Sequence, residues 1–343
     1  FSGAISKLFG HKLTQRHPLL GAFYAVLAAF LFGVNGATSK VAITTGLTPE
    51  QVVSVRTLTA AILALTWALA RNPRLLLINP RDLPRLMILG VIGVGGLQWT
   101  YSIGVSNLPV GIALLIEYTA VIIIPIATFL FFKEKARPQL WIGAFMVIIG
   151  LVLVSEIWGG GLNPTGVIFA FGAALCLTYY FIGAERIQRR VSTTAVMVYA
   201  IGTAAILFFI FADWGSLEPG ALGQTVNLMG NLDGFDVPQW WLMIWLGIMG
   251  AFLPMLFTYL AVRHISSTVM GVISTSEVLF AFLFGFLWLG ETIGIIQTIG
   301  GIVVLVGILI AQTSRVRRLD RRNGEINVNS RPNTGGLRED STV

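Results

Sequence analysis

The sequence predicts an all-α integral membrane protein with ten transmembrane helices, arranged as two inverted five-helix repeats. Three observations predict this fold: a composition too apolar for a water-soluble core, ten apolar segments long enough to cross a bilayer, and sequence matches between the two halves of the chain. Because five is an odd number of crossings, the second half must enter the membrane in the opposite direction to the first.

The composition places most of the chain in lipid. Of 343 residues, 55% are hydrophobic and 11% are charged, and the mean hydropathy is +0.80. A soluble domain carries about 25% charged residues, and one aqueous core cannot bury so much apolar surface. The single cysteine, Cys176, excludes a disulfide framework and a cysteine-cluster metal site. We expect neither a metal nor a cofactor.

Each membrane span needs ~20 mostly apolar residues. Turn residues such as Asn72-Pro73 and Asn163-Pro164 separate the apolar segments. Residues 1–18 are expected to form a cytoplasmic N-terminal segment, and the polar, Arg-rich residues 313–343 a disordered basic cytoplasmic tail. The predicted spans are 19–41, 50–70, 84–105, 109–132, 139–156, 164–184, 193–212, 239–262, 267–289 and 292–312.

The distribution of basic residues predicts the orientation. If the N-terminus is cytoplasmic, 21 of the 23 Lys and Arg residues fall in inner segments and none falls in an outer loop. This is the pattern of the positive-inside rule. We therefore expect a multi-pass protein of the cell membrane with both termini in the cytoplasm. The net charge of +7 is a topology signal, and no nucleic-acid partner is expected.

Matches between the two halves indicate an internal repeat. The pentapeptide TAAIL occurs at 59–63 and again at 203–207, an offset of 144. Further matches keep their order along the chain, and their offset rises to 157 between Glu134 and Glu291 because the second half contains a long outer loop. The repeats are residues 19–156 and 164–312. Inverted repeats of this kind are a transporter architecture, with the site near the midplane between the halves.

Four motifs carry a resemblance to a known family. They are GVNGATSKVAI at 33–43, TPEQVVSVRTLTAAIL at 48–63, GIALLIEYTAV at 111–121 and STSEVLFAFLFGFLWLGETI at 274–293. With these motifs the chain resembles the EamA family of ten-helix permeases, in the drug/metabolite transporter superfamily, over about residues 19–312. The third motif is also similar to the threonine/homoserine-exporting branch, with Ala120 and Val121 where that branch has Gly-Pro.

Two carboxylates lie deep within predicted spans. Glu117 is about nine residues into the fourth span and Glu277 about eleven into the ninth. A charged side chain at the centre of a membrane helix costs ~2.5–3.5 kcal/mol, so such residues usually face a cavity or a partner. We expect Glu117 to bind a substrate ammonium or to exchange a proton for it; the alternative is a structural ion pair or hydrogen bond. For Glu277, substrate contact and helix bracing are equally favoured.

Two basic residues within spans are expected to be structural charges. Lys40, near the outer end of the first span, can extend its ammonium to the interface. Arg56, in the second span, is expected to pair with a carboxylate or to hold the helix in place, with direct substrate contact the less favoured alternative. Glu134 and Glu291 are expected to cap the spans that follow them.

Polar-tipped aromatic residues lie too deep for the interfacial belt. Such rings can line a cavity and hold a cation on their faces, or they can make helix contacts. Asn35 is either a cavity residue or a cross-helix hydrogen-bonding group. The candidate substrate-binding residues are Glu117, Tyr118, Asn35, Trp99, Tyr101, Tyr179, Tyr180, Tyr259 and Glu277.

The sequence favours a secondary transporter over an enzyme. It contains no Walker loop, H-E-x-x-H or G-x-S-x-G motif. The resemblance implies that the protein moves a small polar metabolite, with export of amino acids or related compounds by alternating access as the preferred reading. Proton coupling is compatible with a buried carboxylate. The alternatives are efflux of lipophilic cationic drugs and, in another class, a non-transporting membrane scaffold.

Overall fold

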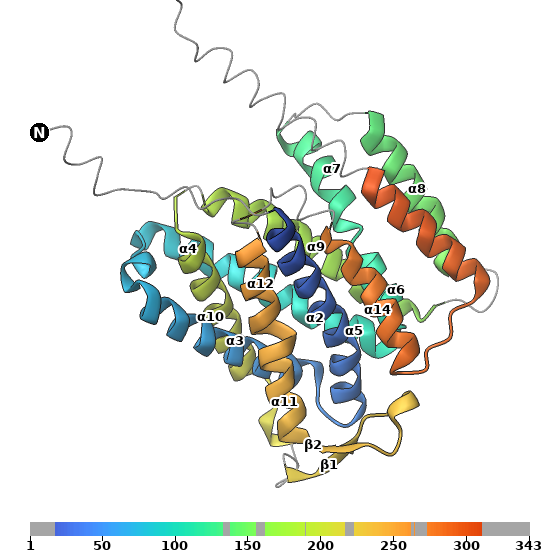
Figure 1. Cartoon of the computed structure of the whole chain (residues 1–343). Helices are drawn as coiled ribbons and strands as arrows, with labels where there is room; N and C mark the ends of the chain where they lie inside the picture. Colours follow the sequence, from blue (N-terminus) through green and yellow to red (C-terminus); the bar gives the residue numbers. More distant parts are fainter. Residues whose placement is uncertain are drawn as a thin grey trace, which may run out of the picture.

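The computed structural model describes residues 18–132, 138–155, 162–188, 190–216, 223–261, 264 and 273–310, and within these it is helical apart from one short hairpin (Figure 1). The N-terminal segment, the basic tail, Glu134 and the side chain of Tyr259 lie outside the described residues.

The first half comprises the following elements in order: α2 (Pro18–Thr44), α3 (Pro49–Arg71), η1 (Pro73–Leu76), η2 (Pro80–Asp82), α4 (Leu83–Ile88), the π-helical segment η3 (Leu89–Gly96), α5 (Leu97–Asn107), α6 (Val110–Glu117), α7 (Ala120–Phe132) and α8 (Pro138–Ser155).

The second half comprises α9 (Pro164–Ile187), α10 (Thr193–Phe211), η4 (Trp214–Ser216), β1 (Thr225–Asn227), η6 (Gly230–Leu232), β2 (Asp236–Pro238), α11 (Gln239–Gly247), the π-helical segment η7 (Ile248–Phe252), α12 (Leu253–Ala261), α14 (Ser276–Leu287) and a last helix, Ile295–Ile310.

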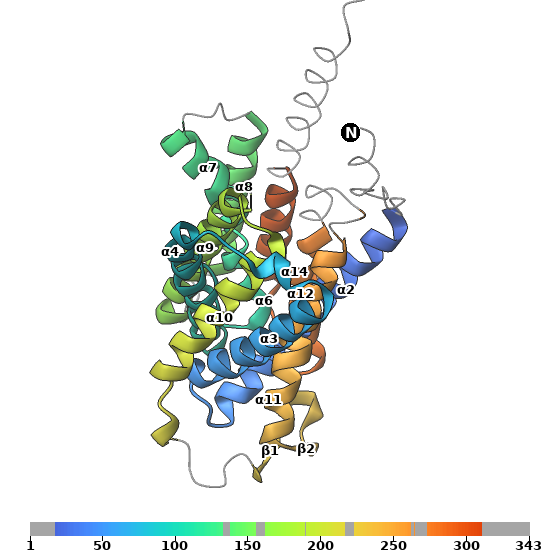
Figure 2. The same ribbon diagram turned by 90° about the vertical axis from the view of Figure 1, so that its left-hand side faces the viewer.

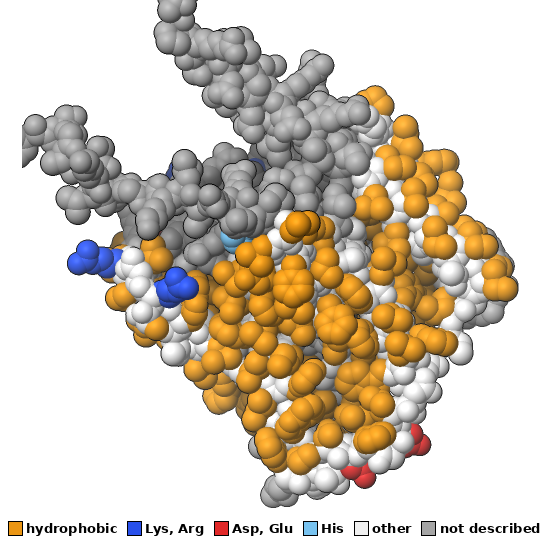
Figure 3. Space-filling view, in the orientation of Figure 1, with side chains coloured by type: hydrophobic (Ala, Val, Ile, Leu, Met, Phe, Trp, Pro, Cys, Tyr) orange, Lys and Arg blue, Asp and Glu red, His pale blue; other side chains and the backbone are white. Residues whose placement is uncertain are grey.

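The helices have the length and surface of a multi-pass membrane protein. Six are long and apolar enough to cross a bilayer, and the described residues also form shorter apolar helices over Val110–Ile124, Trp141–Val154, Ser276–Leu287 and Ile295–Ile310. Large apolar side chains lie on the outside; Ile295, for example, is 81% exposed. Figure 3 shows them covering one face of the molecule between a basic edge and an acidic edge.

Local sequence signals set where several helices begin. Thr48 caps α3 through a capping box with Gln51, and Pro49 occupies the first helical position, where its missing N–H costs nothing. Asn163 caps α9 by accepting a hydrogen bond from the Thr165 N–H. The fourth predicted span departs from expectation, because it divides into α6 and α7 at Tyr118 and Thr119.

Successive helices run between two ends of the molecule. The hairpin of β1 and β2, which pairs Val226 with Val237, marks one of them, called here the hairpin end (Figures 1 and 2). There, Gln51 Nε2 donates to the Asp213 carbonyl at 2.7 Å and Asn231 N–H donates to the Trp288 carbonyl at 2.7 Å. At the opposite end, Ser192 and Tyr199 donate to the carbonyl groups of η1.

Helices from the two halves pack in corresponding pairs. In the first half, α2 packs on α12 and α14; in the second, α9 packs on α5 and α6. These are equivalent contacts, because α2 and α9 are the first helices of their halves. Helices α3 and α10, each the second of its half, pack on each other.

The contact between α8 and the last helix is also reciprocal. Gly150 lies against Gly300, and Gly143 lies against Gly307, so closely that a Cβ on Gly150, Gly300 or Gly307 would meet the partner's backbone. Gly143 and Gly150 match Gly300 and Gly307 at the 157-residue offset. Gly150 therefore contacts Gly300, the counterpart of Gly143, and Gly143 contacts Gly307, the counterpart of Gly150. This exchange is what a contact across a two-fold axis produces.

The repeated TAAIL pentapeptide makes matching contacts in both halves. Thr59 packs against Gly247, and Thr203 packs against Gly90. Both glycines belong to an LGxxG sequence, and in both halves the helix carrying it turns π-helical there, in η3 and in η7. Local π-helical turns are frequent at functional sites because they leave backbone carbonyls outside the regular ladder.

Candidate functional site

A buried cluster of charged side chains lies between the two halves. Arg56 on α3 and Glu117 at the end of α6 are 4% and 8% exposed, and Glu277 on α14 is half-buried. Both carboxylates lie within electrostatic reach of the Arg56 guanidinium, yet neither forms an ion pair with it among the described residues. We call Arg56, Glu117, Glu277, Tyr101 and Tyr118 the central cluster.

The break between α6 and α7 positions Glu117 and Tyr118. The Tyr118 N–H still donates to Leu114 O, at 2.9 Å, but the Thr119 N–H donates to Ile116 O, at 3.1 Å, which tightens the turn and ends α6. A short 3₁₀ turn within an otherwise helical segment often marks a functional hinge.

Tyr118 connects the two carboxylate-bearing helices. Its hydroxyl donates to Glu277 Oε2 at 2.7 Å and also lies 3.0 Å from the Ser274 carbonyl oxygen. Helix α14 packs on α6, where the Phe282 ring covers Gly111 so closely that no Cβ fits there. The hydrogen bond holds Glu277, whereas Glu117 makes no side-chain hydrogen bond within the described part of the chain.

Several buried polar atoms have no partner within the described residues, and they lie on α2, α3 and α5, the helices that carry Asn35, Arg56 and Tyr101. Arg56 uses only Nη2, in a 3.4 Å bond to the Gly250 carbonyl of η7. Leaving a buried polar atom without a partner costs ~1–3 kcal/mol, so this interior is suited to a polar ligand or to water. Within the described residues the unpartnered atoms on these three helices are Asn35 Oδ1, Ser39 Oγ, Ser54 Oγ, Arg56 Nε, Arg56 Nη1, Gln98 Oε1 and Ser102 Oγ.

The structure brings five of the nine predicted binding residues to this region. Glu117, Tyr118, Tyr101 and Glu277 belong to the central cluster. Asn35 lies beside it, because its side-chain oxygen is in contact with Gly250, which also receives the Arg56 bond. The hydroxyl of Tyr101, on α5, approaches Gly36, which follows Asn35 on α2.

Three other predicted residues lie elsewhere. Trp99 Nε1 donates to Glu50 Oε1 at 2.6 Å, at the beginning of α3. Tyr179 is 37% exposed on the outer surface. Tyr180 packs among apolar residues next to Gly93 of η3.

Lys40 and Glu291 form an ion pair at the hairpin end. Lys40 Nζ lies 2.6 Å from Glu291 Oε1 and donates to the Leu108 carbonyl at 2.9 Å. Glu291 Oε2 accepts the Val110 N–H at 3.0 Å. Glu291 is therefore a helix cap, as expected, but it caps α6 in the other half instead of the helix that follows it.

The candidate residues chosen from the sequence did not include the unpartnered serines, Ser39, Ser54 and Ser102, or the backbone carbonyl of Gly250. Ser39 is four residues after Asn35, so both lie on one face of α2, and this i, i+4 spacing was a readable signal. The carbonyl carried no side-chain signal; only the LGxxG sequence around η7 marks the place.

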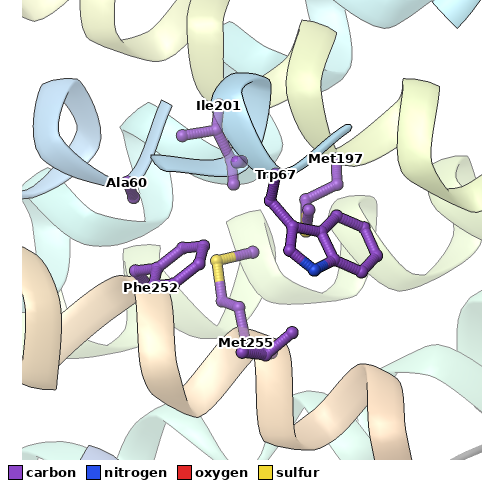
Figure 4. A pocket seen from close by; sticks show the side chains of 8 residues that line it. Ala60, Trp67, Met197, Ile201, Phe252 and Met255 are labelled. Atoms are coloured by element: carbon purple, nitrogen blue, oxygen red, sulfur yellow. The ribbon is translucent and has the colours of Figure 1, made fainter. Parts of the chain in front are cut away.

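An apolar pocket adjoins the cluster (Figure 4). Ala60, one turn after Arg56, begins its α3 wall, which continues through Trp67; Met197 and Met255 close it from α10 and α12. Arg71 lies over the Trp67 ring, 5.9 Å from its centroid. The lining residues are Ala60, Ala64, Trp67, Met197, Ile201, Phe252, Met255 and Leu256.

A comparison with models of known protein families shows to which family the chain belongs. The model of the EamA-like transporter family matches residues 19–156 and again residues 164–313. The chain belongs to the EamA-like transporter family. The resemblance drawn from its sequence motifs is confirmed, and the protein is a transporter of this family.

Curated EamA relatives and a solved structure agree with this membership. An uncharacterized transporter, YdfC of Bacillus subtilis, is 24% identical over 272 residues, covering 77% of this chain and 81% of the relative. The threonine/homoserine exporter RhtA of Escherichia coli K12 is 24% identical over 246 residues, covering 68% and 75%. A crystal structure with 20% identity covers 88% of this chain and 98% of its own, with a TM-score of 0.57, so the fold is shared.

Proposed function

We propose that this EamA transporter exports amino acids or closely related small polar metabolites across the cell membrane by alternating access. The observation that carries the proposal is the central cluster between the halves: the buried Arg56 and Glu117 and the half-buried Glu277, with donors of Arg56 left open to a ligand. Intramembrane ionisable groups of this kind mark substrate and ion pathways.

The proposal includes ten spans in two inverted repeats. The reciprocal contacts Gly143–Gly307 and Gly150–Gly300, and the matching contacts of Thr59 and Thr203, support it. So does the family model, which matches the chain twice. With the N-terminus in the cytoplasm, the hairpin end faces outward and both termini face inward, consistent with the basic residues of the inner segments.

Glu117 is the proposed ammonium site. Its carboxylate is buried and makes no hydrogen bond within the described residues, so it is open to a cation. With both carboxylates ionised the cluster has two negative charges and one positive, and it attracts either a substrate ammonium or a proton. Competition between these two cations for one carboxylate provides a route to proton-coupled export.

The name of one relative supports the substrate class. RhtA is named as a threonine/homoserine exporter, and residues 111–113 and 117–119 of this chain match the motif of that branch. Threonine and homoserine are small zwitterions with a hydroxyl group, and the unpartnered hydroxyls of Ser39, Ser54 and Ser102, on the helices that carry Arg56 and Tyr101 and on α2, suit a polar side chain.

A second candidate function is the efflux of lipophilic cations. The apolar pocket one turn along α3 from Arg56 is the observation that favours it, because Trp67, Phe252 and two methionines line it. Its cavity of about 10 Å³ has room for one water, so these side chains must move before a larger cation fits. The unpartnered donors of Arg56 disfavour it, because a ligand without an acceptor group leaves them unpaired.

Counterflow in proteoliposomes distinguishes the two. Purified protein is reconstituted in vesicles loaded with unlabelled threonine, and entry of labelled threonine is followed; a parallel set uses tetraphenylphosphonium. The proposal expects saturable threonine counterflow and none of the lipophilic cation. Cation counterflow without amino-acid counterflow would reverse the assignment.

A further inference from the structure

We infer that Arg56 is the carboxylate anchor of the site, so that the substrate binds as a zwitterion with its carboxylate on Arg56 and its ammonium on Glu117. This inference rests on the proposed amino-acid transport. It gives Arg56 a direct role in substrate binding. From the sequence alone, a structural role for Arg56 was favoured over this one.

Arg56 has the hydrogen-bonding capacity that an anchor requires. A guanidinium carries five N–H donors. Within the described part of the chain the guanidinium donates once, from Nη2 to Gly250 O at 3.4 Å, and Nε and Nη1 have no partner. A group that is 4% exposed gains no compensation from bulk water. A carboxylate supplies the missing acceptors and the missing charge in one group.

A purely structural role predicts a different arrangement. A bracing arginine directs its donors at fixed protein acceptors. Lys40 shows this pattern at the hairpin end, where one ammonium contacts both Glu291 and the Leu108 carbonyl. Arg56 has two carboxylates within electrostatic reach but pairs with neither. The guanidinium and the Glu117 carboxylate therefore both remain available to a third group that carries the complementary charges.

The charges also favour a zwitterion over a simple amine. An amine satisfies Glu117 and leaves the donors of Arg56 without partners, and an N-acylated acid does the reverse. Hydrogen bonds to charged groups contribute ~1.5–3 kcal/mol each, so losing either end of the ligand should weaken binding roughly 10- to 150-fold. The two charges of the site thus act together as a selectivity device for free amino acids.

The test is competition against labelled threonine in proteoliposomes. Unlabelled threonine, threonine amide and N-acetylthreonine compete against wild type, Arg56→Lys and Arg56→Gln. In wild type both analogues should compete at least tenfold more weakly than threonine. In Arg56→Gln the preference for threonine over its amide should collapse, while the preference over N-acetylthreonine remains. Arg56→Lys keeps the charge and should keep part of the preference.

Two outcomes overturn the inference while leaving transport intact: the amide competes as well as threonine in wild type, or the preference over the amide survives in Arg56→Gln. No threonine transport in wild type would instead overturn the proposed function. If the Arg56 variants do not fold, a measurement on the wild-type protein still tests the inference. Modification of Arg56 by phenylglyoxal, mapped by mass spectrometry, should be blocked by threonine and not by threonine amide. Equal labelling with both ligands contradicts the inference.

Discussion

Lys40 and Glu291, 251 residues apart in the chain, form an ion pair of 2.6 Å that joins the two halves of the molecule at the hairpin end. Each partner also holds the beginning of α6, Lys40 through the Leu108 carbonyl and Glu291 through the Val110 N–H. Three elements from both halves meet in this arrangement, and α6 carries Glu117 at its other end.

Breaking this pair should destabilise the protein. Lys40→Met and Glu291→Gln are each expected to cost ~1.5–3 kcal/mol, the value of hydrogen bonds to charged groups, because each leaves a partly buried charge without its partner. The double variant should lose less than the sum of the two. Thermal unfolding in detergent measures this. Arg85→Met is the control, because Arg85 is 61% exposed in its pair with Asp82 and should change stability by less than about 1 kcal/mol. Additive losses at Lys40 and Glu291 would show that the pair does not couple the halves.

The glycine contact between α8 and the last helix should not tolerate a side chain. A Cβ on Gly300 would lie 2.8 Å from the Gly150 carbonyl oxygen, so Gly300→Ala should cost ~1–3 kcal/mol by overpacking. Gly202→Ala on α10 is the matched control, because it has open space around it, and it should be neutral or stabilising by up to ~1 kcal/mol. Equal melting temperatures for the two variants would contradict the close packing of these helices.

The proposed inversion of the repeats can be mapped with single cysteines. In a Cys176→Ser background, Asp233→Cys and Thr292→Cys should react with an impermeant maleimide in intact cells. Arg74→Cys and Lys135→Cys should react only after permeabilisation, because the proposed topology places them in the cytoplasm. Reaction of Lys135→Cys and Thr292→Cys from the same side would exclude two inverted five-helix units.

The hydrogen bond from Tyr118 to Glu277 should matter for transport. Tyr118→Phe removes a 2.7 Å bond to a carboxylate and is expected to lower the rate of threonine counterflow about tenfold, with ~1–2 kcal/mol lost from stability. The same change at Tyr179, which is exposed, should leave flux and stability unaltered. Initial rates in proteoliposomes decide this. An equal loss of flux in Tyr118→Phe and Tyr179→Phe would show that the hydrogen bond from Tyr118 to Glu277 does not matter for transport.

Features of the site that depend on depth along a helix were predictable, and those that depend on rotation about its axis were not. Counting apolar residues places Glu117 and Glu277 mid-membrane, because the rise per residue is fixed. Tyr179 and Tyr180 have the same depth and chemistry but point about 100° apart, and only packing decides which faces lipid. Trp99 was expected in the cavity, but its indole N–H reaches Glu50, a contact between helices that no local pattern encodes.

The turn between α6 and α7 at Tyr118 could also not be predicted from the sequence. Neither Gly nor Pro lies at Tyr118 or Thr119, so no turn signal marks the place. The residue at the turn, Tyr118, donates its hydroxyl to Glu277, a contact that requires α14 to pack against α6 and that no local sequence pattern encodes. The helix starts at Thr48 and Asn163 were predictable because their caps are local.

Counterflow of labelled threonine in wild type and Glu117→Gln tests the central claim most directly. Glu117→Gln keeps the shape of the side chain and removes its charge, and Glu50→Gln is the control, because this carboxylate contacts Trp99 away from the cluster. With equal amounts of folded protein, flux should fall at least tenfold in Glu117→Gln and stay near wild type in Glu50→Gln. Undiminished flux in Glu117→Gln at every pH would contradict a substrate site at the central cluster.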